Sequence, residues 1–370
     1  MLRKYRIKDY DFKLVLMLIA ISVIGILAVG SAEKELQQKQ LMGFLLGLFL
    51  MVVISLFDYA VFLRFWWVIY AVNAILLVLV IFFGKEVGGA QRWLDIGIQF
   101  QPSELAKILL ILFYAKFIMK YEEKINDIKI LFFAVVLVVP VLLMILKQPD
   151  LSTTIMIFIV FCVMFFVGGI SYKYVFGILG VAIPTFVILF IQILQPDQQI
   201  IEKYQRNRIM AWLHPEDYAT TEAYQQLNSI MAIGSGQLTG KGLNNNVVNS
   251  VKNGNFISEP QTDFIFTIVG EELGFLGGCA VLFLVIGIAA ECIIIAYKAK
   301  DTAGKIIAAG MGALIGFQGI LNICVATGLM PNTGIPLPFV SAGLTSMVAL
   351  YIGMGFVLNV RLQAIRKYNN

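Results

Sequence analysis

The feature that most constrains this chain is a series of uninterrupted apolar runs, each roughly 18 to 24 residues long. A helix of that length crosses about 30 Å of hydrocarbon, and the runs do not alternate as the strands of a barrel would. Only 14% of the 370 residues are charged, far below the share in a soluble domain. The sequence therefore predicts an all-α integral membrane protein of about ten transmembrane helices. We expect the spans near 12–30, 41–57, 60–83, 104–119, 129–146, 152–170, 174–195, 274–297, 303–328 and 340–360.

The chain reads as a single polytopic membrane domain, 1–370, with one large loop at about 196–273 between helices 7 and 8. Lys and Arg are concentrated in alternate connections, as at Lys116, Lys120 and Lys124. Because basic residues favour the cytoplasmic side, we expect both termini inside and the large loop outside. The outer connections are longer and contain prolines, glycines and isolated charges, so any chemistry is expected at the outer face.

The loop before the fourth span, GGAQRWLDIGIQFQPSELAK, carries three candidate polar residues. Glu104 and Lys107 are three residues apart and share one helix face. An ion pair at the head of a membrane helix is expected to face a wet or protein-lined cavity; the alternative is a structural salt bridge at the bilayer boundary. Arg92, beside Trp93, either anchors the chain at the interface or holds a phosphate.

Two further segments offer charge. In KQPDLSTT, before the sixth span, Asp150 either caps that helix or contributes to a site. In YQRNRIMAWLHPEDY, Arg206 and Arg208 stand among aromatic and apolar residues, a pattern typical of a helix on the membrane surface or of a grip on lipid phosphates. His214 is the only histidine, and no metal-ligand spacing is present, so any metal ligands stay unknown.

The segment SEPQTDFIFTIVGEELGFLGG places Asp263 at the start of an apolar run, where it either caps a helix or acts on a substrate. Glu271 and Glu272 follow and would lie deep in hydrocarbon if that helix stood upright. Because 274–297 is long enough to cross alone, we expect 263–272 to form a short helix in the interface or along a cavity. Glu271 and Glu272 are secondary acidic candidates.

The last outer segment, ATGLMPNTGIPLPFVSAGLTS, contains three prolines that forbid a regular helix, at positions 331, 336 and 338. Broken backbone near a membrane needs a protein-lined or wet environment. We therefore expect this segment, with Ser341, to line a cavity.

Together these motifs resemble the SEDS proteins, the RodA/FtsW/SpoVE family. The segments that carry the resemblance are QPSELAK, KQPDLSTT, RIMAWLHPEDY, GSGQLTGKGL, EPQTDFIFTIVGEELGF and NICVATGLMPNTGIPLPFVSAGLTS, in order along nearly the whole chain. The family signature has a second glycine where this chain has Leu344. The short tails and compact length favour the RodA type.

The resemblance implies a ten-helix protein with both termini inside. It also implies a peptidoglycan glycosyltransferase that polymerises lipid II at the outer face of the bacterial cytoplasmic membrane, for cell-wall elongation or division and cell shape. Its partners would be a class B penicillin-binding protein and undecaprenyl-linked glycan, with no nucleic acid. Asp263 would be the essential acid, with Glu104, Lys107 and Asp150 at the same cavity.

For the chemistry, Asp263 could act as general base on the incoming hydroxyl, giving inversion at the anomeric carbon. The departing pyrophosphate needs positive charge from Lys107, Arg92, Arg206, Arg208 or a divalent cation, Mg or Mn. The main alternative is a lipid II flippase, since ionisable residues and broken helices serve transport equally well. A scaffold for a partner protein is a third reading, but it leaves the acidic residues without a role.

Overall fold

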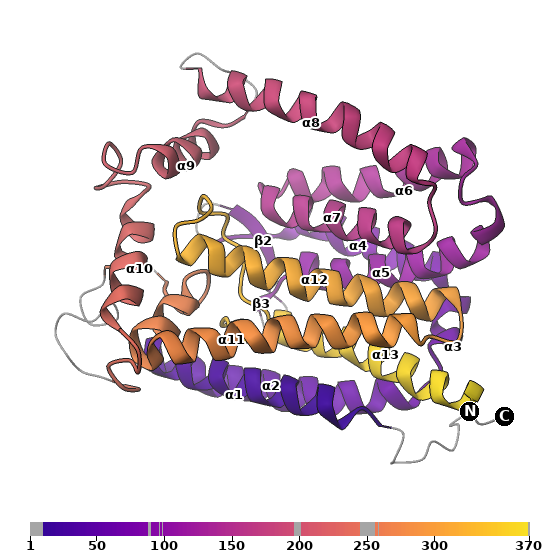
Figure 1. Ribbon diagram of the computed structural model, residues 1–370, viewed down its shortest axis with the longest axis horizontal. Coiled ribbons are helices and arrows are strands. Elements are labelled where there is room, and N and C mark those ends of the chain that lie inside the picture. The colour runs from indigo at the N-terminus through magenta and orange to yellow at the C-terminus, as the bar shows by residue number, and fades with distance from the viewer. Residues whose placement is uncertain are drawn as a thin grey trace.

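The computed structural model describes residues 10–368, except 88–89, 96, 98, 196–200, 245–255 and 258, so parts of the expected loop at 196–273 lie outside the described residues. The elements, labelled in Figure 1, are α1 Phe12–Ala32, α2 Lys34–Leu56, α3 Tyr59–Arg64, α4 Trp66–Phe83, β1 Lys85–Val87, β2 Ala90–Asp95, β3 Gln99–Phe100, α5 Pro102–Lys120, a 3₁₀ turn Glu122–Lys124, α6 Ile128–Leu146, α7 Leu151–Val167, α8 Tyr172–Leu194, α9 Lys203–Leu213, α10 Tyr224–Ser235, α11 Ile265–Tyr297, α12 Thr302–Ala326 and α13 Leu344–Tyr368.

The long helices lie where the apolar runs predict them, and the prediction of an all-α membrane protein is confirmed. Among the described residues, eight helices are long and apolar enough to cross a membrane. The others expected to cross are α7, with only 17 residues, and α5, which carries four charged residues. The count of about ten spans and the placement of the loop stay predictions.

Two helix boundaries differ from those expected. Helix α2 begins at Lys34 rather than near 41, because the polar stretch KELQQKQ consists of good helix formers. Helix α13 begins at Leu344 rather than near 340, because Ser341 is held in a turn by the Leu337 N–H, which donates to its hydroxyl oxygen (2.7 Å). The loop therefore reaches further into the fold than the sequence indicates.

Helix α11 is kinked at the boundary between the short helix expected at 263–272 and the span expected at 274–297. Gly274 adopts φ 67° and ψ −164°, which separates a short helix, 265–273, from the long helix that follows. A positive φ of this kind suits glycine. The expectation of a separate short helix before the span is thus confirmed, although it is buried rather than spread on a surface, since Ile265 to Glu272 are all buried.

A small antiparallel sheet, in the order β1–β2–β3, stands between α4 and α5. The sequence predicted only a loop at this position. Arg92 and Trp93 lie on β2, and this sheet fixes the direction of Arg92 towards the turn between α6 and α7.

The bundle has a packed centre and a loosely attached edge. Within their apolar windows, 72% of the residues of α12 and of α13 are buried, against none of those in α8. Helix α8 runs along the outer edge, while α9 and α10 cover one end of the bundle; α1 begins and α13 ends at the opposite end (Figure 1). The chemistry-bearing loops gather at the α9–α10 end.

Candidate functional site

Asp263 lies on the loop immediately before α11 and does not cap that helix. The N-cap residue is Phe264, with no side-chain cap hydrogen bond. The main chain at Asp263 is fixed by Asn322, whose Nδ2 donates to its carbonyl oxygen (2.7 Å) and also to that of Ile335 (2.7 Å). Among the described residues, no donor is hydrogen-bonded to the Asp263 carboxylate. Of the two readings left open by the sequence, the capping role is therefore wrong.

The proline-containing loop 331–343 wraps around Asp263. Gly334, at φ 70°, lies so close that a Cβ there would stand 3.3 Å from Oδ2 of Asp263. The Ser341 hydroxyl donates to the carbonyl oxygen of Thr262 (2.6 Å), and the N–H of Ala342 donates to that of Gln261 (2.8 Å). Ser341 thus joins this loop to the residues before Asp263, while the expectation that the loop lines a cavity stays a prediction.

The surroundings of Asp263 favour its protonated form. Burial raises the pKa of the Asp263 carboxyl from 3.8 to about 6. The Arg208 guanidinium is the strongest charge opposing that rise, and Arg92 opposes it less, whereas Glu259 and Asp150 add to it. A carboxyl with a pKa near 6 is ionised at neutral pH but more basic than an ordinary aspartate, which suits a general base.

Glu104 and Lys107 form a buried ion pair in the first two turns of α5. Lys107 Nζ donates to Oε1 of Glu104 (2.8 Å), and both side chains are 4% exposed. Ser346 of α13 donates to Oε2 of Glu104 (2.7 Å). Lys107 Nζ also donates to Oε1 of Gln318 (3.0 Å), whose Nε2 donates to the carbonyl oxygen of Pro336 (3.0 Å). The pair therefore links α5, α12 and α13 to the loop beside Asp263.

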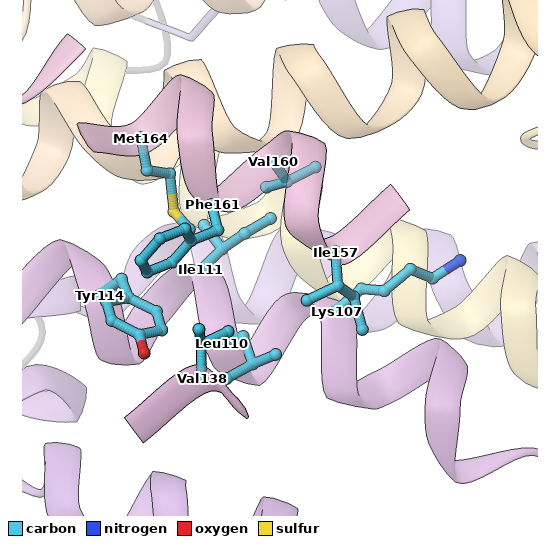
Figure 2. Close-up of a pocket in the computed structure, with 9 residues that line it drawn as sticks. All are labelled: Lys107, Leu110, Ile111, Tyr114, Val138, Ile157, Val160, Phe161 and Met164. Atoms are coloured by element: carbon cyan, nitrogen blue, oxygen red, sulfur yellow. The ribbon is translucent and has the colours of Figure 1, made fainter. Parts of the chain in front are cut away.

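A small cavity lies beside the stem of Lys107 but is not the site. It measures about 10 Å³, room for roughly one water, and its lining comes from α5, α6 and α7. Figure 2 shows apolar side chains such as Phe161 and Met164 around it, with the Lys107 nitrogen pointing away. The ammonium group belongs to the ion pair and not to this cavity.

Arg92 and Asp150 organise the turn between α6 and α7. Arg92 Nε donates to the carbonyl oxygen of Gln148 (3.1 Å), and its guanidinium also donates to that of Pro149. Asp150 caps α7, with its Oδ1 accepting from the N–H of Thr153 (3.0 Å). The capping reading of Asp150 is confirmed. Both residues also influence the pKa of Asp263, so they border the same site.

The two arginines of α9 have different surroundings. Arg206 donates through Nε to the carbonyl oxygen of Ile193 (3.2 Å) and through Nη2 to that of Leu194 (3.2 Å), at the end of α8. A cation there also complements the helix dipole. Arg208 lies over the Tyr204 ring, 5.8 Å from its centroid, and is the cation with the strongest effect on Asp263. The structure brings Arg208 to the site and places Arg206 at the helix end.

Glu271 and Glu272 are buried inside the protein and not in lipid, as the sequence predicts. Oε1 of Glu271 accepts from Lys241 Nζ (2.8 Å), and Oε1 of Glu272 accepts from the Ser31 hydroxyl of α1. Both acids fasten the short helix of α11 to neighbouring segments.

Four residues around the site were not predicted from the sequence: Gln318, Asn322, Ser346 and Gly334. A signal existed for two of them: Gln318 and Asn322 are four apart within the apolar run of α12 and share one helix face. Polar side chains at that spacing inside a membrane helix indicate a protein-lined polar site. The roles of Ser346 and Gly334 could not be predicted from the sequence, because they depend on contacts between segments that are distant along the chain.

No cluster of three or more His, Cys, Asp or Glu side chains suited to a metal ion occurs within the described part of the chain. The carboxylates bordering the site do not form a complete ligand cage by themselves.

The profile of the FtsW/RodA/SpoVE family, described as "Cell cycle protein", matches residues 10–365. The chain belongs to the FtsW/RodA/SpoVE family. The resemblance seen in the motifs is thereby confirmed over nearly the whole length.

Two curated relatives in this family cover almost the entire chain. The "Peptidoglycan glycosyltransferase MrdB" of Escherichia coli (strain K12) is 34% identical, over 95% of this chain and 93% of its own. The "Probable peptidoglycan glycosyltransferase FtsW" of Trichlorobacter lovleyi is 32% identical, over 97% and 95%. A solved structure described as "Structural coordination of polymerization and crosslinking by a peptidoglycan synthase complex" superimposes with a TM-score of 0.78 at 28% identity, covering 96% of this chain and 98% of that one.

Proposed function

We propose that this chain is a peptidoglycan glycosyltransferase that polymerises lipid II, with Asp263 as its general base. The assignment of Asp263 rests on the state of its carboxylate. This group is half-buried, its pKa is raised to about 6, and it accepts no hydrogen bond from the described residues. Two other acids predicted for the site, Glu104 and Asp150, accept hydrogen bonds that hold elements together. The two curated relatives, both named peptidoglycan glycosyltransferases, support the reaction class.

In this reaction the 4-hydroxyl of one disaccharide lipid attacks the anomeric carbon of the growing chain. A new glycosidic C–O bond forms, the bond to the lipid pyrophosphate breaks, and the hydroxyl proton passes to Asp263. Attack from the side opposite the leaving group inverts the anomeric centre. Removing the proton in the transition state is worth on the order of 10²- to 10⁴-fold in rate.

Among the basic candidates, Arg208 is best placed to stabilise the departing pyrophosphate. Lys107 is sealed in its pair with Glu104, Arg92 donates to two main-chain carbonyls, and Arg206 is engaged at the end of α8. Arg208 is the strongest positive charge acting on Asp263 and lies on α9, beside the site. Guanidinium matches phosphate oxygens in two-pronged hydrogen bonds.

A divalent cation, Mg or Mn, is a further proposal. Mg²⁺ is commonly held by one or two carboxylates together with substrate phosphate oxygens, so an incomplete protein cage is compatible with it. The pyrophosphate and an acidic side chain other than Asp263 would supply such oxygens. Titration of the metal-free enzyme with Mg²⁺ or Mn²⁺ tests this, and full activity in excess chelator would contradict it.

We place both termini in the cytoplasm of a bacterial plasma membrane and the α9–α10 end outside, within one domain, 1–370. The bias of Lys and Arg and the grouping of the candidate residues at one end support this orientation. A cysteine at the exposed Glu216, in a chain without its native cysteines, should react with an impermeant reagent on intact cells. Reaction only after lysis would place the site on the wrong face.

A class B penicillin-binding protein is the expected partner, since polymerised strands must be cross-linked by another protein. The solved complex that coordinates "polymerization and crosslinking" supports this. Co-purification of the two proteins from detergent tests the partnership. A fully active enzyme in cells that lack every such partner would contradict it.

The experiment that tests the function is polymerisation of purified lipid II by the purified chain with its partner. Long glycan strands are the expected product. The alternative, a flippase, would instead move labelled lipid II across vesicles without joining sugars. Transport without polymer would replace the proposed function.

A further inference from the structure

The glycine-rich segment 236–242 packs into the kink of α11, a contact that the reaction itself does not explain. A Cβ on Gly240 would stand 2.1 Å from the carbonyl oxygen of Glu272, and a Cβ on Gly274 would stand 2.2 Å from the main-chain nitrogen of Gly240. A Cβ on Gly236 would stand 2.0 Å from the carbonyl oxygen of Gly270. Only glycine fits at these contacts, and Gly240 and Gly274 also have positive φ.

The segment also replaces the hydrogen bonds that the kink removes from α11. The N–H groups of Lys241 and Gly242 donate to the carbonyl oxygens of Glu271 and Glu272 (both 3.0 Å). In the other direction, the N–H of Phe275 donates to Gln237 O (2.8 Å), as does the N–H of Leu276 to Leu238 O (3.2 Å). Two backbone groups at each helix end created at Gly274 are thereby paired, as buried backbone requires.

One ion pair reinforces this arrangement. Lys241 Nζ lies 2.8 Å from Oε1 of Glu271, with the glutamate 3% and the lysine 26% exposed. Leaving a buried carboxylate without its paired cation is costly, so the ion pair helps to hold Lys241 and its segment against the kink. Helix α10, which leads into the segment, lies beside the first turns of α11, as Figure 1 shows, and Ser229 of α10 is hydrogen-bonded to Thr267 of α11.

The short helix held in this way begins two residues after Asp263. Its direction is set at one end by the kink and at the other by Asn322, which binds the Asp263 carbonyl. We infer that the segment 236–242 is a splint for the short helix 265–273, and that Lys241, paired with Glu271, is a positioning residue for Asp263. This inference rests on the proposed function, because it assigns a role to Lys241 through the proposed base.

The test compares Lys241→Met, Lys241→Arg and Gly240→Ala in the full chain with its class B partner, using purified lipid II. Matched controls are Lys203→Met, an exposed lysine of α9, and Gly234→Ala, where an added Cβ meets nothing within 4 Å. Asp263→Asn is included as the reference for loss of the base. Thermal unfolding of each purified variant reports the folded fraction.

For Lys241→Met we expect kcat to fall by on the order of 10- to 100-fold with KM nearly unchanged, because a displaced base loses its alignment with the hydroxyl. Lys241→Arg should recover most of kcat, Gly240→Ala should lose activity, and both controls should match the wild type. A merely structural splint would lower the unfolding temperature of Lys241→Met while leaving kcat per folded molecule unchanged, and that result would overturn the inference. Full activity of Asp263→Asn would overturn the assignment of Asp263 as the base. If Asp263→Asn is inactive while the Lys241 and Gly240 variants are active, only the positioning role of segment 236–242 is overturned.

Discussion

Asp263 and Glu104 are both linked by hydrogen bonds to α12, through residues one helical turn apart, yet the surroundings of the two carboxylates differ. Gln318 of α12 connects to Lys107, the partner of Glu104, while Asn322, four residues on, holds the main chain of Asp263. Both oxygens of Glu104 accept hydrogen bonds, from Lys107 and Ser346. The carboxylate oxygens of Asp263 accept none from the described residues.

The difference separates structural acids from reactive ones. A carboxylate that accepts hydrogen bonds from a cation and a hydroxyl is fully engaged in holding helices together, as Glu104 is. A carboxylate without donors in a partly buried site binds a proton more readily and can take one from a substrate. The four predictions that follow test this distinction, from the largest expected effect to the smallest.

Replacing Asp263 by Asn should abolish nearly all polymerisation, by on the order of 10²- to 10⁴-fold in kcat. Asn keeps the size of the side chain but cannot accept the proton. Lipid II polymerisation by equal amounts of folded protein measures the effect. Activity within a few-fold of wild type would mean that Asp263 is not the base, and Glu271 or Glu272 would become the better candidate.

Replacing Lys107 by Met should instead destabilise the fold, by about 3–5 kcal/mol, because Glu104 would be left buried without its counter-charge. The double variant Glu104→Gln with Lys107→Met should recover part of this loss. Denaturant unfolding in detergent measures both, with Lys116→Met on the same helix as control. Equal stability of the single and double variants would show that the pair is not coupled.

The Asp263→Asn variant should be slightly more stable than the wild type at pH 7.5. Because the folded-state pKa of Asp263, about 6, lies above its ordinary 3.8, ionisation disfavours the folded state, and stability is lost as the pH rises through that window. The difference in unfolding temperature should vanish below pH 4. A less stable Asn variant at pH 7.5 would indicate that Asp263 holds the fold together.

The smallest effect is expected at Asp150, where the carboxylate caps α7. Asp150→Asn should change stability by only a few tenths of a kcal/mol, since Asn caps about as well, whereas Asp150→Ala should cost about 0.5–2 kcal/mol. Polymerisation by Asp150→Asn should remain within a few-fold of wild type. A loss as large as that of Asp263→Asn would move Asp150 into the catalytic machinery.

The sequence predicted the helices well because uninterrupted apolar runs leave a membrane-spanning chain few alternatives. It also placed Glu271 and Glu272 away from lipid, since charge at that depth is costly. It could not distinguish a capping Asp263 from a free one, because the two share the same position before a helix. The attachment of Arg206 to the end of α8, and the contact of Gly240 with Gly274, depend on segments that meet only after folding.

The central claim, that Asp263 is the ionising base, is tested most directly by the pH dependence of kcat in wild type and Asp263→Asn. For the wild type we predict constant kcat above about pH 7 and a fall approaching tenfold per pH unit below about pH 6, as the carboxylate becomes protonated. The residual activity of Asp263→Asn should show no such fall. An acidic limb of the same midpoint in both proteins would contradict the account, because another group would then carry the proton.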